Sequence, residues 1–107
     1  MTDLVGSWVV DRVDDEPVTG PLLELSADGR LTGTTGVNRV MGPYDVVDGT
    51  LLVGPAATTM MAGSEAAMRL ESRLLALLGG PLAIEAEEDG DGVRLTGADG
   101  SLHLSPA

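Results

Sequence analysis

The sequence of residues 22–34 is LLELSADGRLTGT, and its pattern decides the class of fold. Apolar and polar residues alternate on both sides of Asp28-Gly29, a dipeptide that tolerates the positive backbone angles of a tight turn. The pattern therefore predicts a β-hairpin, with one strand over residues 22–26 and the next over residues 30–34.

The same turn signal recurs along the chain, at Asp48-Gly49, Asp89-Gly90, Asp91-Gly92 and Asp99-Gly100. Short runs with alternating or β-branched residues lie between these dipeptides, which is typical of strands joined by hairpins. The predicted strands cover residues 7–12, 22–26, 30–34, 44–47, 51–53, 82–86, 93–96 and 101–104. This short and regular spacing predicts a mainly β fold, in which an antiparallel meander curls into a barrel or a sandwich.

Residues 64–78 have the periodicity of a helix instead. Apolar residues recur there at steps of three and four, at Ala67, Leu70, Leu74, Leu77 and Leu78. Ser64 is a suitable N-cap, and the sequence Gly79-Gly80-Pro81 ends the helix. We expect the apolar face of this helix to cover the edge of the sheet or the open end of the barrel, with a helix of another chain as the alternative.

The chain has 107 residues, and its 17 acidic and 6 basic side chains give a formal net charge of -11. This length predicts a single domain, residues 1–107. The basic residues are all arginines scattered singly, so we expect no nucleic-acid partner and no membrane partner. The sequence has neither an apolar run of 18 residues nor a positively charged start, which predicts a cytoplasmic protein.

Side chains that could support chemistry are few. The sequence has no cysteine, which excludes a disulfide, a thiolate nucleophile and a thiolate zinc site. His103 is the only histidine, and strand alternation places it on the outer face if Leu102 and Leu104 face the core. One histidine without a G-x-S-x-G motif supports neither a hydrolytic triad nor a histidine-rich metal site. We therefore predict no catalytic residues, no metal site and no cofactor.

A run of acidic residues begins within the predicted strand at residues 82–86. Its members are Glu85, Glu87, Glu88, Asp89 and Asp91. Clustered carboxylates suit calcium, but an EF-hand loop needs a further oxygen ligand before its glycine and a glutamate six residues after it, and the sequence lacks both. We interpret the run as a solvated acidic hairpin tip, with weak binding of a divalent cation as the alternative.

The most distinctive stretch is residues 33–44, GTTGVNRVMGPY. Its three glycines and its asparagine indicate unusual backbone angles or a close approach of chains. The glycine spacing does not match a phosphate-binding loop, and no strand-to-helix context follows. We interpret the stretch as a structural loop, in which Asn38 bonds neighbouring backbone groups and Tyr44 buries its ring with its hydroxyl hydrogen-bonded at one end.

These residues resemble the sequence pattern of the META domain family, which includes heat-shock-inducible HslJ-type proteins. The family pattern is Gly-x-x-Gly-Cys-Asn, then Gly-x-Tyr, a hairpin, and Thr-x-Met-Ala-Cys before a helix. The residues that match it here are Gly33, Gly36, Asn38, Gly42, Tyr44, Thr58, Met61 and Ala62. The resemblance covers nearly the whole chain, but the two family cysteines are replaced, by Val37 and Gly63.

The resemblance implies a compact, lipocalin-like antiparallel β-barrel with one amphipathic helix packed against it, and no established chemistry. Because both cysteines are replaced together, it also implies that Val37 and Gly63 are neighbours, with Val37 packing over the glycine. Gly36, Asn38 and Tyr44 are the candidate binding residues.

Three functions are compatible with the sequence. The first is a non-enzymatic stress-response or interaction module with a protein partner, which predicts an exposed apolar patch. The second is a small-molecule-binding barrel, although aliphatic side chains would largely fill a barrel of this size. The third, a hydrolase, lacks a nucleophile with a recognisable base. We also predict that the pair Met60-Met61 is divided between the core and the rim.

Overall fold

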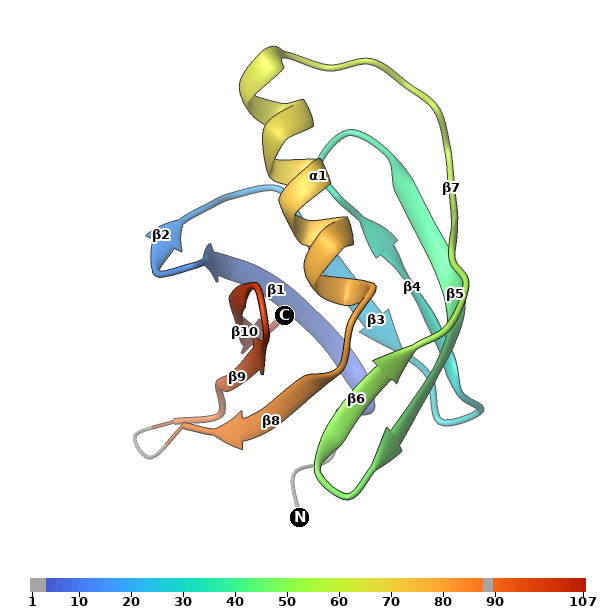
Figure 1. Ribbon diagram of the computed structural model, residues 1–107, viewed down its shortest axis with the longest axis vertical. Helices are drawn as coiled ribbons and strands as arrows, with labels where there is room; N and C mark the ends of the chain where they lie inside the picture. Colours follow the sequence, from blue (N-terminus) through green and yellow to red (C-terminus); the bar gives the residue numbers. More distant parts are fainter. Residues whose placement is uncertain (1–3, 88–89) are drawn as a thin grey trace.

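The computed structural model describes residues 4–87 and 90–107, which form a closed antiparallel barrel of eight strands with one helix packed against it (Figure 1). The barrel strands are β1 (Gly6–Val13), β3 (Leu22–Leu25), β4 (Arg30–Thr34), β5 (Arg39–Val47), β6 (Thr50–Val53), β8 (Leu82–Ala86), β9 (Val93–Gly97) and β10 (Gly100–Pro106). Two short strands, β2 (Glu16–Pro17) and β7 (Ala57–Thr58), pair with β1 and β5. The predicted fold class, a mainly β barrel with one helix, is confirmed.

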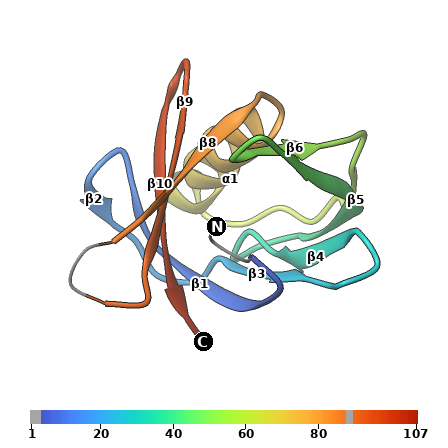
Figure 2. The same cartoon turned by 90° about the horizontal axis from the view of Figure 1, so that it is seen from below.

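Pairing of the last strand with the first closes the barrel. Most strands follow one another round the barrel in chain order, and β10 then pairs antiparallel with β1, from Trp8 opposite Pro106 to Val13 opposite Leu102. Figure 2 shows β1 and β10 side by side. A β-bulge interrupts this pairing near Asp11, and such a bulge re-aims a side chain by adding one residue to one strand.

The glycine-rich stretch is largely strand rather than loop, so its interpretation as one structural loop was wrong. Strand β5 begins at Arg39 and its first half pairs with β4, which leaves only residues 35–38 as a loop. Gly42 admits a neighbouring segment, because a Cβ atom there would lie 3.0 Å from the Cα of Ala56. In the sequence, a glycine that permits this close approach looks the same as a glycine in a turn.

Aliphatic side chains fill the interior of the barrel. The largest fully buried side chains are those of Leu23, Leu25, Leu31, Leu51, Leu74, Leu82, Leu95, Leu102, Leu104, Val10, Val40 and Val93. Trp8 joins this core, and its indole N–H donates a hydrogen bond to the carbonyl of Leu4 at 2.9 Å. The core is a single cluster to which both the strands and the helix contribute.

Helix α1 (Glu65–Leu78) lies across one end of the barrel (Figure 1). Ser64 is its N-cap, as predicted, and the serine hydroxyl accepts a hydrogen bond from a backbone amide of the first turn. Leu74 and Leu77 are buried in the core and Leu70 packs against it, which confirms the predicted apolar face. In the part of the chain that the structure describes, no helix has both the length and the apolar character that crossing a membrane requires.

Candidate functional site

The three residues predicted as a binding site do not come together. Gly36 and Asn38 lie in the loop between β4 and β5, where Gly36 has a φ of 101°, in the region that favours glycine. Tyr44 lies farther along β5 and is half-buried, and its hydroxyl donates to the carbonyl of Ser26 at 2.5 Å. The bonded hydroxyl agrees with the structural role predicted for Tyr44, although its ring is only partly buried.

The side-chain amide of Asn38, which is 3% exposed, makes hydrogen bonds on all sides. Its oxygen accepts from the amide of Met61 at 2.6 Å and from the hydroxyl of Thr59 at 3.0 Å. Its nitrogen donates to the carbonyl of Met61 at 3.0 Å and to Oε1 of Glu71 at 2.7 Å. These contacts use the full bonding capacity of an amide. Asn38 does bond backbone groups, as predicted, but they lie 23 residues away in the sequence.

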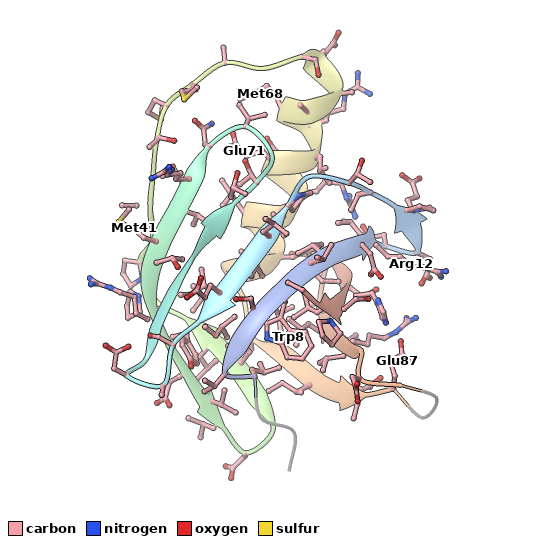
Figure 3. All side chains as sticks on the ribbon, turned by 180° about the vertical axis from the view of Figure 1, so that it is seen from behind. Trp8, Arg12, Met41, Met68, Glu71 and Glu87 are labelled. Carbon is pink, nitrogen blue, oxygen red and sulfur yellow. The ribbon has the colours of Figure 1, made fainter. Side chains whose placement is uncertain are left out.

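The sequence reasoning missed Glu71, the acceptor at the centre of this network. Glu71 is 8% exposed, and its Oε1 also accepts a hydrogen bond from the hydroxyl of Thr35 at 2.8 Å. Figure 3 shows it on α1, beside the connection between β4 and β5. A signal was present in the sequence, because Glu71 falls on the apolar face of the helix, between Ala67 and Leu74. An acidic residue at such a position indicates a buried hydrogen-bond partner.

The network fixes the segment between β6 and α1, residues 54–64, which we call the strap. Strand β7 lies within the strap and pairs with β5, and Asn38 binds both the amide and the carbonyl of Met61. The methionine side chains therefore point outward: Met60 is 94% exposed and Met61 is 62% exposed. The prediction that this pair divides between core and rim was wrong, because the backbone of Met61, and not its side chain, faces the interior.

Methionines gather along the strap, and we define the methionine surface as Met41, Met60, Met61 and Met68. Met41 is exposed and lies opposite Ala57 of β7, and the sulfur of Met68 accepts a hydrogen bond from the amide of Gly63 at 3.4 Å (Figure 3). In the described part of the chain, every methionine belongs to this surface and none to the core. The strap itself contains no charged residue, in a chain whose net charge is -11.

Two grooves flank helix α1. The groove between α1 and the strap has a volume of about 510 Å³, and its apolar lining includes Val40, Ala56, Leu75 and Leu78. The groove on the other side of α1, of about 540 Å³, is bordered by acidic and basic side chains of the helix and of the β1–β2 region. Both grooves open on the surface, whereas the barrel interior that we considered for a small ligand is filled by the core.

A second polar cluster lies on the outer face of β1 and β10. The β-bulge brings Asp11 to His103, with 2.5 Å between Oδ1 and the ring nitrogen Nδ1, and Ser105 donates to Oδ2 at 2.6 Å. The other ring nitrogen lies 2.5 Å from Oε1 of Glu87. Burial raises the pKa of Asp11, but the bonds from Ser105 and His103 and the histidine charge lower it by more, so this pKa lies below its ordinary value.

This cluster lacks the arrangement of a hydrolytic triad. In a triad the hydroxyl bonds to one imidazole nitrogen and the carboxylate to the other, whereas Ser105 here bonds Asp11 and both nitrogens of His103 face carboxylates. His103 is on the outer face, as predicted, and is held between two acids. Of the acidic run, Glu88 and Asp89 lie outside the described residues, and within the described ranges no three potential ligands are placed to hold a metal ion.

The chain matches a known family by its sequence and several solved structures by its fold. Residues 2–106 match the sequence model of the META domain. A protein solved by NMR is similar in structure, with a TM-score of 0.76 and 19% sequence identity over 94% of this chain and 87% of that one. An NMR structure of a protein from Burkholderia xenovorans is also similar, with a TM-score of 0.76, 24% identity, and coverage of 95% of this chain and 81% of that one.

A crystal structure of a DUF4847 family protein from Bacteroides vulgatus ATCC 8482 is a more distant match. Its TM-score is 0.68 at 10% identity, and the alignment covers 95% of this chain and 92% of that one. No curated protein matches the sequence at a significant level. At such identities the likeness to the solved structures shows the fold alone.

Proposed function

Because the chain belongs to the META domain family, a membership that by itself assigns no chemistry, we propose that it is a non-catalytic module that binds a protein partner through the methionine surface. The supporting observation is the placement of the methionines. The core consists of leucine and valine with Trp8 and contains no described methionine, while Met60 and Met61 are exposed to solvent. Methionine is flexible and polarizable, and it is over-used at adaptable protein-binding surfaces.

The strap favours binding because it is preformed. The hydrogen bonds of Asn38 to Met61 and Thr59 fix its backbone before any partner arrives. A partner then meets an ordered surface and does not have to supply the free energy of ordering a loop. Removing exposed methionine side chains from water provides the driving force.

The absence of catalysis is part of the proposal. It is supported by the geometry of His103, both of whose ring nitrogens face carboxylates, and by the hydroxyl of Ser105, which bonds Asp11 instead of a base. We also propose a cytoplasmic location and a part in the stress response. The family resemblance supports the stress response, and the close contact of Val37 with Gly63, made without a disulfide, suits a reducing compartment.

Site-specific cross-linking tests the proposal. A photo-cross-linking amino acid is placed at Met60, and in a separate variant at Val47, which is also exposed but lies at the far end of β5. We expect a discrete cross-linked protein from position 60 in extracts of the source cells, and none from position 47. The protein identified in this way is then purified and its affinity for the chain is measured directly.

Paired substitutions decide whether the contact is specific. The double variant Met60→Asp with Met61→Asp is expected to lower the affinity for the purified partner by about tenfold or more, because it places charge in an apolar contact. The control Val47→Asp with Leu52→Asp makes the same change of charge at two other exposed apolar residues and is expected to bind like the wild type. Equal affinities of both double variants, or no cross-link from position 60, would refute the proposal.

A further inference from the structure

We infer that the partner presents a basic segment. This segment places an apolar side chain in the groove between the strap and helix α1, and its lysine or arginine side chains lie at the edges of the groove. This inference rests on the proposed function and adds to it the chemistry of the partner. Three observations support the inference. They are the uncharged lining of the groove, the partial negative charge at the C-terminal end of α1 beside it, and the net negative charge of the chain.

The groove is uncharged along both walls, and most of its lining is apolar. One wall is formed by the strap with Ala56 and Thr58, and the other by the last turns of α1 with Leu75 and Leu78. None of the residues that line it is charged, and its volume of about 510 Å³ has room for a large apolar side chain. The strap supplies one wall of this groove and also carries Met60 and Met61, so a partner that is seated in the groove and reaches over the strap contacts both.

The C-terminal end of α1 gives the groove a preference for positive charge. Gly79, the C-cap of the helix, is part of the lining. The last backbone carbonyls of a helix carry a partial negative charge, which favours a cation close by. In many helices a lysine or arginine of the last turn meets this need, but α1 has no basic residue there. An incoming lysine or arginine of a partner can take this place.

The charge of the whole chain points to the same partner. With 17 acidic and 6 basic residues, the chain attracts cationic molecules and repels anionic ones at long range. The same field opposes a second copy of the chain, since both copies have a net charge of -11. It also opposes nucleic acids and anionic membrane surfaces, which leaves a basic protein segment as the occupant that the charge and the groove favour together.

Three short synthetic peptides, each with a fluorescent label, test the inference on the full chain. The first is an amphipathic peptide of leucine and lysine, the second has glutamate in place of lysine, and the third has the composition of the first with its amphipathic order scrambled. Fluorescence anisotropy measures their affinities at low and at high salt. We expect the leucine–lysine peptide to bind at least about tenfold more tightly than the other two, and to weaken as salt rises.

A matched pair of variants localises this binding. Ala56→Arg places bulk and positive charge in the wall of the groove, whereas Ala86→Arg makes the same change at an exposed alanine of β8. We expect Ala56→Arg to abolish most of the binding and Ala86→Arg to retain it. Equal loss in both variants would show a general attraction of charges, and binding of the glutamate peptide would show the wrong partner chemistry; either outcome overturns the inference.

The outcome is distinguishable from failure of the proposed function. If the leucine–lysine peptide does not bind, but the cross-linked protein still loses affinity in the double variant at Met60 and Met61, the interaction module stands and the basic segment is wrong. If neither effect appears, the proposed function has failed as well.

Discussion

The side chain of Val37 packs on Gly63 so closely that a Cβ atom added at Gly63 would lie 2.8 Å from Cγ2 of the valine. The contact joins the loop between β4 and β5 to the strap immediately before α1. The proximity implied by the family resemblance is confirmed, and it explains why glycine suits position 63 while valine occupies position 37. A methyl group at 63 would have to displace the valine.

The double variant Val37→Cys with Gly63→Cys is expected to form a disulfide under mild oxidation. The methyl group of Val37 already stands close to where the sulfur of a cysteine would have to be, so the backbone needs little movement. A bridge across this separation in sequence stabilises a domain by about 2–4 kcal/mol in favourable cases. Thermal unfolding with and without a reductant measures the gain, with Val37→Cys alone as the control. Free thiols that persist after oxidation would contradict the contact.

Removal of Glu71 should destabilise the fold although the residue is acidic and the chain is already strongly negative. Glu71→Ala leaves the buried donors of Thr35 and Asn38 without their acceptor, at a cost of about 2–3 kcal/mol in the free energy of unfolding. Glu71→Gln keeps a carbonyl acceptor and should cost less than half as much. If urea unfolding shows the same stability for wild type and both variants, Glu71 does not hold the network.

Asn38→Ala should release the strap as well as destabilise the barrel. The variant removes the acceptor that holds the amide of Met61 and the donor that holds its carbonyl. Hydrogen exchange at the Met61 amide is therefore expected to accelerate by more than the exchange of barrel amides such as Leu31. A uniform acceleration across the chain would mean that Asn38 acts on global stability only.

Leu74→Ala tests the packing of the helix. Leu74 is fully buried in the core, so its truncation should cost about 2–5 kcal/mol. Ser72→Ala, on the exposed side of the same helix, should change the stability by less than about 0.5 kcal/mol. Chemical unfolding of both variants makes the comparison, and a cost at Leu74 as small as that at Ser72 would place the wrong face of α1 on the barrel.

The lowered pKa of Asp11 predicts how the free energy of unfolding depends on pH. Its pKa in the folded protein lies below the ordinary value, so the ionised carboxylate contributes stability at pH values above the ordinary pKa, and this contribution is lost as the pH falls through the folded pKa. The carboxylate is partly exposed, which limits the effect to about 1 kcal/mol or less. Asp11→Asn should remove that part of the pH dependence, whereas Asp91→Asn, at an exposed position, should not. Identical acid unfolding curves for the wild type and Asp11→Asn would contradict the assignment.

Local patterns were sufficient to predict most of the fold. Turn dipeptides such as Asp28-Gly29 and Asp48-Gly49 separate strands because the residues at the turn need positive φ, and Gly29 and Gly49 have it. The helix was predictable because a cap, an apolar face and a glycine stop agree. Strand β7 was not, since two residues in an uncharged segment show no alternation and pair only where β5 passes beside them.

The candidate site depended on contacts that are distant in sequence. Asn38 stood out, but its partners Met61 and Glu71 lie 23 and 33 residues away, and no local period connects them. The prediction for Met60-Met61 failed because hydrophobicity alone assigns a methionine to the core, whereas a backbone held by a buried amide turns these side chains outward. The strap and the groove beside it form only when strands that are distant in the sequence close the barrel, and local sequence patterns do not predict such contacts.

Methionine methyl NMR tests the central claim most directly, namely that a basic partner docks on the methionine surface. The full chain carries isotope-labelled methionine methyl groups and is titrated with the leucine–lysine peptide, while backbone amides are followed in parallel. The account predicts saturable shifts of the Met41, Met60 and Met61 methyl signals, together with amides of the strap and of the last turns of α1, and no shift around His103. Shifts confined to the face around His103, with the methionine signals unmoved at saturation, would contradict it.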